Sequence, residues 1–267
     1  MKLVENYEEI SPLLMKYFKN GLMTNNFLNE AQYKNAVKSK ALQFYEWDDG
    51  IIFLNAKESF SKLTYELLSL NSKLNVKLPE KTIIEIVKRP NDVAYGDVLN
   101  YWKNNGFNIV LNRIRLVNEN SKNILTSESL CGDTKILPCV IEDLDGVERI
   151  LKDNFNKYTG CLPSEDELKE IVKNQFVIGA FIDKELVGML HFDIKRGYSE
   201  IRHLAVNEKF RNIGIAGYLI SYYHKNFAQN KSYVWCAAGN SSAKRVYKKY
   251  NYKEDGWTSI VLANFEI

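Results

Sequence analysis

The segment from Glu200 to Gly217 (EIRHLAVNEKFRNIGIAG) carries the residues whose spacing is best suited to ligand chemistry. Its first half predicts a strand, and residues 211–217 follow a turn and open a helix. The small residues Gly214, Ala216 and Gly217 let a ligand approach the backbone closely. Because the first N–H groups of a helix lack a partner inside it and lie at the positive end of its dipole, this helix start suits a pyrophosphate. A tight strand-to-helix turn with glycines for packing explains the same residues without a ligand.

A second informative run begins at Asn240 and reads NSSAKRVYKKYNY. The helix predicted over 241–250 places Ala243, Val246 and Tyr247 on one face. By this pattern alone, Tyr247 is a core tyrosine.

Both runs must be positioned by the alternating α and β elements that fill the second half of the chain. The predicted strands are 135–142, 176–182, 186–194, 199–206, 232–238 and the strand-like end 257–267; the predicted helices are 143–156, 164–174, 214–228 and 241–250. Ser164 with Glu167 three residues later has the form of a capping box at the second helix.

Together these features resemble the GNAT (GCN5-related N-acetyltransferase) superfamily. Its acetyl-CoA-binding signature is Arg or Gln, two residues, Gly, one residue, then Gly or Ala, which Arg211, Gly214 and Ala216 match. The strand before it ends in Leu204-Ala205-Val206, as the family's does.

The second family motif has Asn, then Ala three residues on and Tyr seven residues on, which Asn240, Ala243 and Tyr247 match. Asn251-Tyr252 stands where the family usually has Gly-Phe. Because Asn tolerates a left-handed backbone, this difference is mild.

The resemblance implies a role for each matched position. Leu204, Ala205 and Val206 would pair with the pantetheine arm, and one N–H there would polarise the thioester carbonyl. Asn240, with Ala243 in its motif, would touch the pantetheine or its surroundings. Tyr247 would be the general acid that protonates the leaving CoA thiolate. The CoA pyrophosphate would be held by the segment Arg211, Asn212, Ile213, Gly214, Ile215, Ala216 and Gly217 through its backbone amides.

Attack by an amine on a thioester requires the free amine, so the ammonium must lose a proton. Glu200 stands where the histone-acetylating branch of the superfamily has its catalytic glutamate, which makes it the leading base. His203 has a suitable near-neutral pKa, but strand alternation places it on the face opposite to Glu200. His191 and Asp193 share one face of the preceding strand and are candidates acting through water. A hydrogen-bonded structural histidine is the alternative for both of these histidines and for His224.

Other polar groups of this half give weaker indications. By the resemblance, residues 156–168 are the expected acceptor-binding region. The acidic run 165–167 either attracts a cation or is a solvated helix start. Cys236 is either an acyl-cysteine or a buried thiol. The cysteines show no CxxC pair and no zinc-site spacing, which predicts reduced structural thiols and no metal; they are Cys131, Cys139, Cys161 and Cys236.

The first half has a similar but less regular order of elements. Strands are predicted at 1–5, 41–47, 51–55, 60–68 and 82–88 and in a final run to Val117, with helical segments up to about residue 38 and at 92–104. Residues 97–117 resemble the end of a GNAT unit, but no counterpart of the 211–217 motif precedes them. We therefore expect a tandem arrangement: a degenerate GNAT-like domain without CoA at 1–120, a linker at 121–133 and a GNAT domain at 134–267. Arg113 and Arg115, two apart on one strand face, either meet an anionic substrate or lie on a solvated edge.

The composition is that of a folded globular protein, with 45% hydrophobic and 26% charged residues in 267. Lys plus Arg number 36 against 33 for Asp plus Glu, and this balance does not indicate nucleic acid or membrane as a partner. No apolar run approaches the roughly 20 residues of a membrane helix, and the start MKLVENYEEI lacks a signal core, so we expect a cytoplasmic protein.

The expected fold is α/β (α+β): two GNAT-like units, each a central mixed, mostly antiparallel sheet flanked by helices. The expected activity is acetyl-CoA-dependent transfer of an acetyl group directly to the primary amine of a small-molecule or peptide acceptor, by a monomer or homodimer. Two alternatives stay open. One is transfer of another acyl group or transfer to a hydroxyl, and the other is a non-catalytic CoA-binding module.

Overall fold

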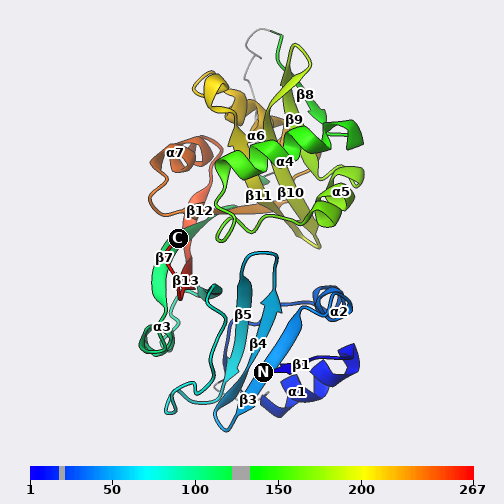
Figure 1. Ribbon diagram of the computed structural model, residues 1–267. Helices are drawn as coiled ribbons and strands as arrows, with labels where there is room; N and C mark the ends of the chain where they lie inside the picture. Colours follow the sequence, from blue (N-terminus) through cyan, green and yellow to red (C-terminus); the bar gives the residue numbers. More distant parts are fainter. Residues whose placement is uncertain (18–21, 122–132) are drawn as a thin grey trace. The chain divides into compact units, whose positions relative to one another are not determined.

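The computed structural model describes residues 1–17, 22–121 and 133–267 (Figure 1). They form two compact units: the first unit contains residues 1–112 with 257–267, and the second unit contains residues 113–256. The linker predicted at 121–133 lies almost wholly outside the described residues.

The second unit is built on a sheet with the strand order β7-β12-β11-β10-β9-β8. Only β11 and β12 are parallel neighbours, and the other neighbours in this order are antiparallel. The strands are β7 (Asn108–Asn118), β8 (Lys135–Pro138), β9 (Val177–Ile182), β10 (Glu185–Lys195), β11 (Tyr198–Val206) and β12 (Lys231–Ala237); the helices are α4 (Leu144–Asn154), α5 (Glu165–Lys173), α6 (Ile215–Asn226) and α7 (Ser241–Lys249).

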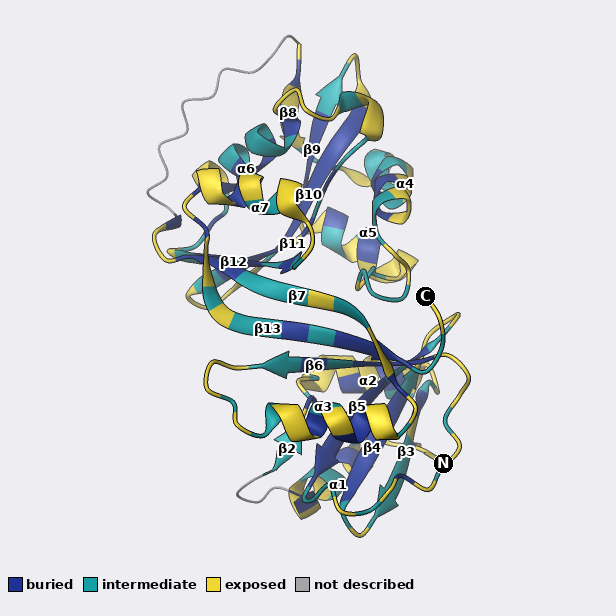
Figure 2. Ribbon diagram, turned by 90° about the vertical axis from the view of Figure 1, so that its left-hand side faces the viewer, coloured by how far each residue is buried: buried dark blue, intermediate teal, exposed yellow. Residues whose placement is uncertain are grey.

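Helices cover both faces of this sheet. Along β10, Val187 and Leu190 belong to the apolar core shared with α6 and α7, whereas Leu186 and Met189 belong to the core shared with α4 and α5. Residues three apart share a face here because the pairing of β10 with β9 shifts by one residue between Leu186 and Gly188, which makes Val187 an extra residue. Figure 2 shows the buried strands β9 and β10 between the two pairs of helices.

The first unit repeats the plan around a sheet with the order β1-β3-β4-β5-β6-β13, with β2 pairing to β5. Its parallel neighbours are β5 and β6. The strands are β1 (Lys2–Leu3), β2 (Met23–Thr24), β3 (Leu42–Trp47), β4 (Gly50–Ala56), β5 (Ser61–Leu67), β6 (Thr82–Lys88) and β13 (Lys253–Ala263); the helices are α1 (Ile10–Tyr17), α2 (Glu30–Lys38) and α3 (Tyr95–Asn104).

The predicted elements and fold class are confirmed, with three local differences. The strand predicted at 257–267 begins at Lys253 and ends at Ala263. The strand predicted at 135–142 ends at Pro138 and is followed by a 3-10 turn at Ile141–Asp143. Strand β2 was not predicted.

The units also differ from the predicted domains 1–120 and 134–267, because two strands cross from one unit to the other. Residues 113–118 of β7 pair with β12, and residues 258–263 of β13 pair with β6. Within the described part of the chain, no helix has the length and hydropathy needed to cross a bilayer.

Candidate active site

A left-handed turn opens helix α6. After β11 the chain makes a 3-10 turn at Glu208–Phe210, and Gly214 is the N-cap of α6 with a φ of 93°. Asn212 also has a positive φ, 66°. Because a Cβ strains the backbone at such φ values, position 214 strongly favours glycine. The first internal bond of the helix joins Tyr218 N to Gly214 O (3.1 Å), so the amides of residues 215–217 have no partner within the helix. This helix start has the donors that an anion needs.

The Arg211 side chain ties this turn to two other parts of the second unit. Its Nε donates to the Val206 carbonyl at the end of β11 (3.2 Å), and its Nη2 donates to Asn154 Oδ1 at the end of α4 (2.8 Å). The guanidinium therefore fixes the turn, and the groups offered to an anion are backbone amides.

Strands β11 and β12 are parallel neighbours that diverge. They pair over Tyr198–Ile201 and Lys231–Val234, and in the described residues their pairing stops there. Residues 204–206 follow on β11 and remain paired to β10 on the other side. Every second N–H and C=O of this stretch points away from β10. The predicted pantetheine-binding residues thus present backbone groups toward the side where β12 diverges.

Asn240 is the N-cap of α7. Its Oδ1 accepts from Ala243 N (3.0 Å) and from Ser242 Oγ (2.9 Å). Helix capping therefore accounts for the spacing between Asn240 and Ala243, and it sets where α7 begins.

Tyr247 is the buried tyrosine of α7. It is 4% exposed, and its ring lies edge-on to that of Tyr252, with centroids 5.5 Å apart. Burial, and to a lesser extent the nearby Cys236 thiol, raise the pKa of its hydroxyl well above the usual value. The hydroxyl is therefore protonated at neutral pH, as an acid must be. Burial also raises the pKa of the Cys236 thiol, which disfavours the thiolate that an acyl-cysteine requires.

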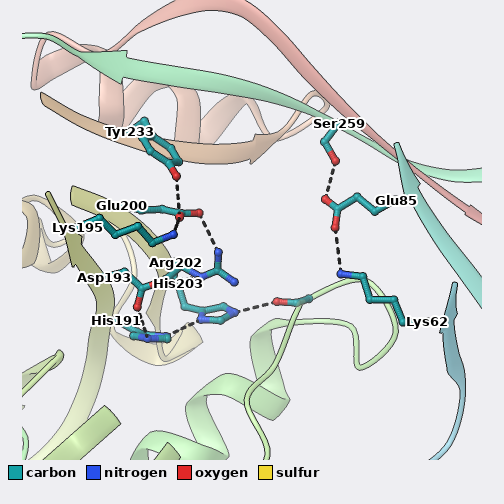
Figure 3. A network of polar contacts seen from close by, with 11 residues as sticks. Lys62, Glu85, His191, Asp193, Lys195, Glu200, Arg202, His203, Tyr233 and Ser259 are labelled. Atoms are coloured by element: carbon teal, nitrogen blue, oxygen red, sulfur yellow. Dashed lines mark hydrogen bonds and ion pairs between the residues drawn. The ribbon is translucent and has the colours of Figure 1, made fainter. Parts of the chain in front are cut away.

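Glu200 lies on β11, 4% exposed, in a network of polar contacts (Figure 3). Arg202 Nη1 donates to Oε1 and the Tyr233 hydroxyl donates to Oε2, both at 2.9 Å. Lys195 Nζ lies 3.9 Å from Oε2. Because a carboxylate has about four acceptor positions, these contacts orient Glu200 and leave positions for an amine or a water.

A β-bulge places His203 on the same face of the sheet as Glu200 (Figure 3), so the prediction that they face apart is wrong. The pairing of β10 with β11 shifts by one residue after the His191–His203 pair, which makes Arg202 an extra residue in β11. The alternation rule assumes a regular strand, and the bulge breaks that regularity.

The two histidines form a buried, hydrogen-bonded pair. Their Nδ1 atoms are 3.0 Å apart, and His203 Nε2 lies 2.8 Å from the Gly160 carbonyl. Burial lowers the pKa of His203 to about 4 and also lowers that of His191, so both rings are neutral at neutral pH.

A carbonyl only accepts, so His203 carries its hydrogen on Nε2 and accepts at Nδ1, where His191 Nδ1 donates. His191 Nε2 is then an unprotonated nitrogen, buried without a hydrogen-bond partner in the described residues, 3.9 Å from Asp193 Oδ1.

Arg113 and Arg115 are both used inside the second unit. Arg115 Nε donates to Asp255 Oδ2 (2.8 Å), and its guanidinium lies 5.4 Å from the centre of the Tyr233 ring. Arg113 Nη2 donates to the Thr159 carbonyl. Of the two alternatives given for these residues, the solvated edge is wrong, because both side chains bond to other segments of the second unit.

His224 and the acidic run at 165–167 have structural partners. His224 Nδ1 lies 3.0 Å from the Ser121 carbonyl, and burial lowers the pKa of His224 to about 4. Glu167 Oε2 accepts from Ser164 N (2.8 Å), which completes the predicted capping box.

The first unit has its own pair of diverging parallel strands, and its own chain enters between them. β5 and β6 pair over 61–63 and 82–84. Farther along β5, β2 adds as an antiparallel partner. Asn25, which is 6% exposed, is the residue directly after β2.

Asn25 bridges the two diverging strands. Its Nδ2 donates to Leu63 O (3.2 Å) on β5 and to Glu85 O (3.0 Å) on β6, and its Oδ1 accepts from Tyr65 N (2.7 Å). A side-chain amide therefore satisfies backbone groups at the place that corresponds to the divergence of β11 and β12.

Sequence reasoning missed Asn25, Arg202 and Tyr233. Asn25 bonds to Tyr65, 40 residues away, and Tyr233 to Glu200, 33 residues away. Local patterns carry no signal for partners at such separations. The bulge at Arg202 likewise has no local signature such as a glycine.

Known proteins are similar to this chain in part of its sequence and in its fold. The profile of the acetyltransferase (GNAT) domain family matches residues 148–261. No curated protein matches the chain in sequence.

Similar solved structures extend over nearly the whole chain. A Drosophila protein has a TM-score of 0.58 at 15% identity, covering 96% of each chain. A GNAT-family acetyltransferase from Colwellia psychrerythraea has a TM-score of 0.57 at 13% identity, covering 99% of each. A tandem GNAT protein from the clavulanic acid biosynthesis pathway has a TM-score of 0.53 at 9% identity, covering 85% of each. At these identities the likeness shows the fold.

Proposed function

We propose that this chain, in which residues 148–261 match the acetyltransferase (GNAT) domain family, is an acetyl-CoA-dependent N-acetyltransferase. In this proposal the acetyl group passes directly to a primary amine of a small-molecule or peptide acceptor. The observation that carries it is the start of α6, whose first amides have no partner within the helix, at the ends of the diverging strands β11 and β12. A ligand with a pyrophosphate at one end and an amide-rich arm at the other matches both features.

The residues fit CoA at both features. Gly214 adopts a backbone conformation that favours glycine, and the amides of 215–217 are available for the pyrophosphate. Residues 204–206 offer alternate backbone groups to the arm. Acetyl-CoA, when bound, supplies an acetyl group activated as a thioester.

Tyr247 is the residue that we propose to give a proton to the leaving sulfur. Its raised pKa keeps the proton on the hydroxyl until it is needed. Its place on α7 is set by the Asn240 cap and by packing against Tyr252.

Glu200 is the residue that we propose to take the proton from the acceptor's ammonium, directly or through a water. Arg202 and Tyr233 hold its carboxylate in one orientation. His191 is the second candidate, because its Nε2 is an unprotonated buried nitrogen beside Asp193.

The test is calorimetric titration of acetyl-CoA and of CoA into the whole protein and into Gly214→Trp. We expect one site per chain, lost in Gly214→Trp because the indole fills the space before the amides of α6. Gly197→Trp is the matched control, since Gly197 has a similar φ of 87° with nothing within 4 Å of an added Cβ.

The outcomes separate the proposals. No binding by the folded wild-type protein would end the acetyltransferase proposal. Binding with thioester turnover that is insensitive to Tyr247→Phe and Glu200→Gln would favour another catalytic arrangement. Binding without turnover on amines or alcohols, with acetyl-CoA or longer acyl-CoA, would favour the non-catalytic module. The cytoplasmic location of the protein and its oligomeric state, monomer or homodimer, remain predictions.

A further inference from the structure

The loop between α4 and α5, residues 155–164, is held by two side chains that donate to consecutive backbone carbonyls. Arg113 Nη2 donates to the Thr159 carbonyl. His203, whose ring lies beside that of His191 in Figure 3, donates from Nε2 to the Gly160 carbonyl at 2.8 Å. Arg113 comes from β7 and His203 from β11. Two separate strands of the sheet therefore fix one loop at adjacent points.

The loop is folded so that it presents these carbonyls. Asn156 Oδ1 accepts from Tyr158 N (2.9 Å) and Thr159 N (3.2 Å), and Gly160 N donates to the Asn156 carbonyl (2.7 Å). A Cβ on Gly160 would lie 2.7 Å from that carbonyl oxygen and 2.9 Å from the Phe155 Cβ. A side chain there would force the backbone to shift, so this compact turn depends on glycine.

The His203 contact has a fixed direction. His191 Nδ1 donates to His203 Nδ1, which leaves His203 Nε2–H for Gly160. The Phe155 ring lies edge-on to His203 with centroids 4.8 Å apart, and His191 stacks on it at 5.3 Å. His203 is 3% exposed. Its neighbours therefore hold the donor at one position.

We propose that Arg113 and His203 are positioning residues that hold residues 155–164 as a preformed wall of the acceptor site, on the sheet face that carries Glu200. The part of this inference that concerns the acceptor rests on the proposed function. It follows that the site depends on β7, a strand that precedes the matched domain 148–261. A loosened loop must be ordered again at each binding event, which weakens acceptor binding while the amides of α6 stay in place.

The experiment compares variants that remove each donor with variants that keep one. Arg113→Met and His203→Leu remove the donors, whereas Arg113→Lys and His203→Gln retain an N–H at the end of the side chain. Arg149→Met, at an exposed position of α4, is the matched control.

The first readout is hydrogen exchange of the loop 155–164 by mass spectrometry in the free protein. The second is the Kd for acetyl-CoA by calorimetry. The third is kcat and KM with spermidine and with a single-lysine peptide as amine probes.

We expect amide exchange in the loop to rise about fivefold or more in Arg113→Met and His203→Leu, the size of one lost hydrogen bond. KM for the amine should rise by a similar factor, with kcat and the Kd for acetyl-CoA within about twofold of wild type. The donor-retaining variants should recover most of both effects, and Arg149→Met should show neither.

Unchanged exchange in both donor-removing variants would overturn the proposed hold on the loop. Faster exchange with unchanged KM would overturn its role in acceptor binding. If wild-type protein binds acetyl-CoA but acetylates neither probe nor any other amine, the proposed function fails and the acceptor role falls with it. The exchange data still decide whether the two side chains hold the loop.

Discussion

Replacing Tyr247 with phenylalanine tests the proposed proton donor with little disturbance of the packing. The ring stays in its buried position against Tyr252, and only the hydroxyl is lost. A positioned general acid contributes about 10²- to 10⁴-fold in rate, or about 3–5 kcal/mol of transition-state stabilisation. We expect kcat to fall within that range and the Kd for acetyl-CoA to change by less than about twofold.

The neighbouring Tyr252→Phe variant is the matched control. Its hydroxyl bonds to Ser232 Oγ at 2.7 Å, so its removal should cost about 1 kcal/mol of the free energy of unfolding and leave kcat near wild type. Thiol release is followed spectrophotometrically with the best amine from a panel, and stability by urea unfolding. A Tyr247→Phe enzyme with kcat within about threefold of wild type would refute the acid assignment. Because burial raises the pKa of Tyr247, wild-type kcat should also show no loss from ionisation of this tyrosine between pH 8 and 9.

Three further predictions concern the base, the first unit and pH. Glu200→Gln should lower kcat/KM about 100-fold or more near neutral pH, with a rate that then rises tenfold per pH unit as the acceptor amine deprotonates itself; a pH–rate profile like that of wild type would contradict the base role. Asn25→Ala removes the side-chain partner of three backbone groups of the first unit, two of them in buried hydrogen bonds, and should lower the free energy of unfolding by about 3 kcal/mol, measured by urea denaturation; a loss under about 1 kcal/mol would show that the bridge is dispensable. The pKa of His224 is about 4 in the folded protein and about 6.5 in the unfolded chain, so the unfolded chain takes up the proton first as the pH falls. The contribution of neutral His224 to the free energy of unfolding is therefore complete above pH 6.5 and is lost as the pH falls toward 4. In wild type, the free energy of unfolding should therefore fall by about 2 kcal/mol more between pH 7 and pH 5 than it does in His224→Asn, a variant that keeps a donor for the Ser121 carbonyl. An equal fall in the two proteins would contradict the low pKa assigned to His224.

Local patterns were sufficient for most of the elements and for the left-handed turn before α6. The helix openings at Ser164 and Gly214 and the left-handed φ of 60° at Asn251 follow from interactions within a few residues. The short β2 was missed because two residues form no period, and its pairing with β5 is about 40 residues distant.

Domain boundaries were harder to predict, because a strand's partner is not encoded next to it. The polar stretch after Asn118 suggested a division near the middle of the chain. The alternating run before it pairs in part with β12, and the last strand of the chain pairs with β6. An apolar strand has the same composition whichever sheet it joins, so composition does not show which unit residues 113–120 and 257–267 belong to.

The sequence by itself determined the family resemblance, the order of the elements, the glycine turn before α6 and the identity of Tyr247 and Glu200 as candidates. These depend on contiguous residues and on periodicity. Only the tertiary structure decided that a bulge at Arg202 unites Glu200 with the His191–His203 pair, and that Arg113 reaches the loop after α4. Those relations depend on strand register and on contacts between distant segments, which become defined only when the sheet is assembled.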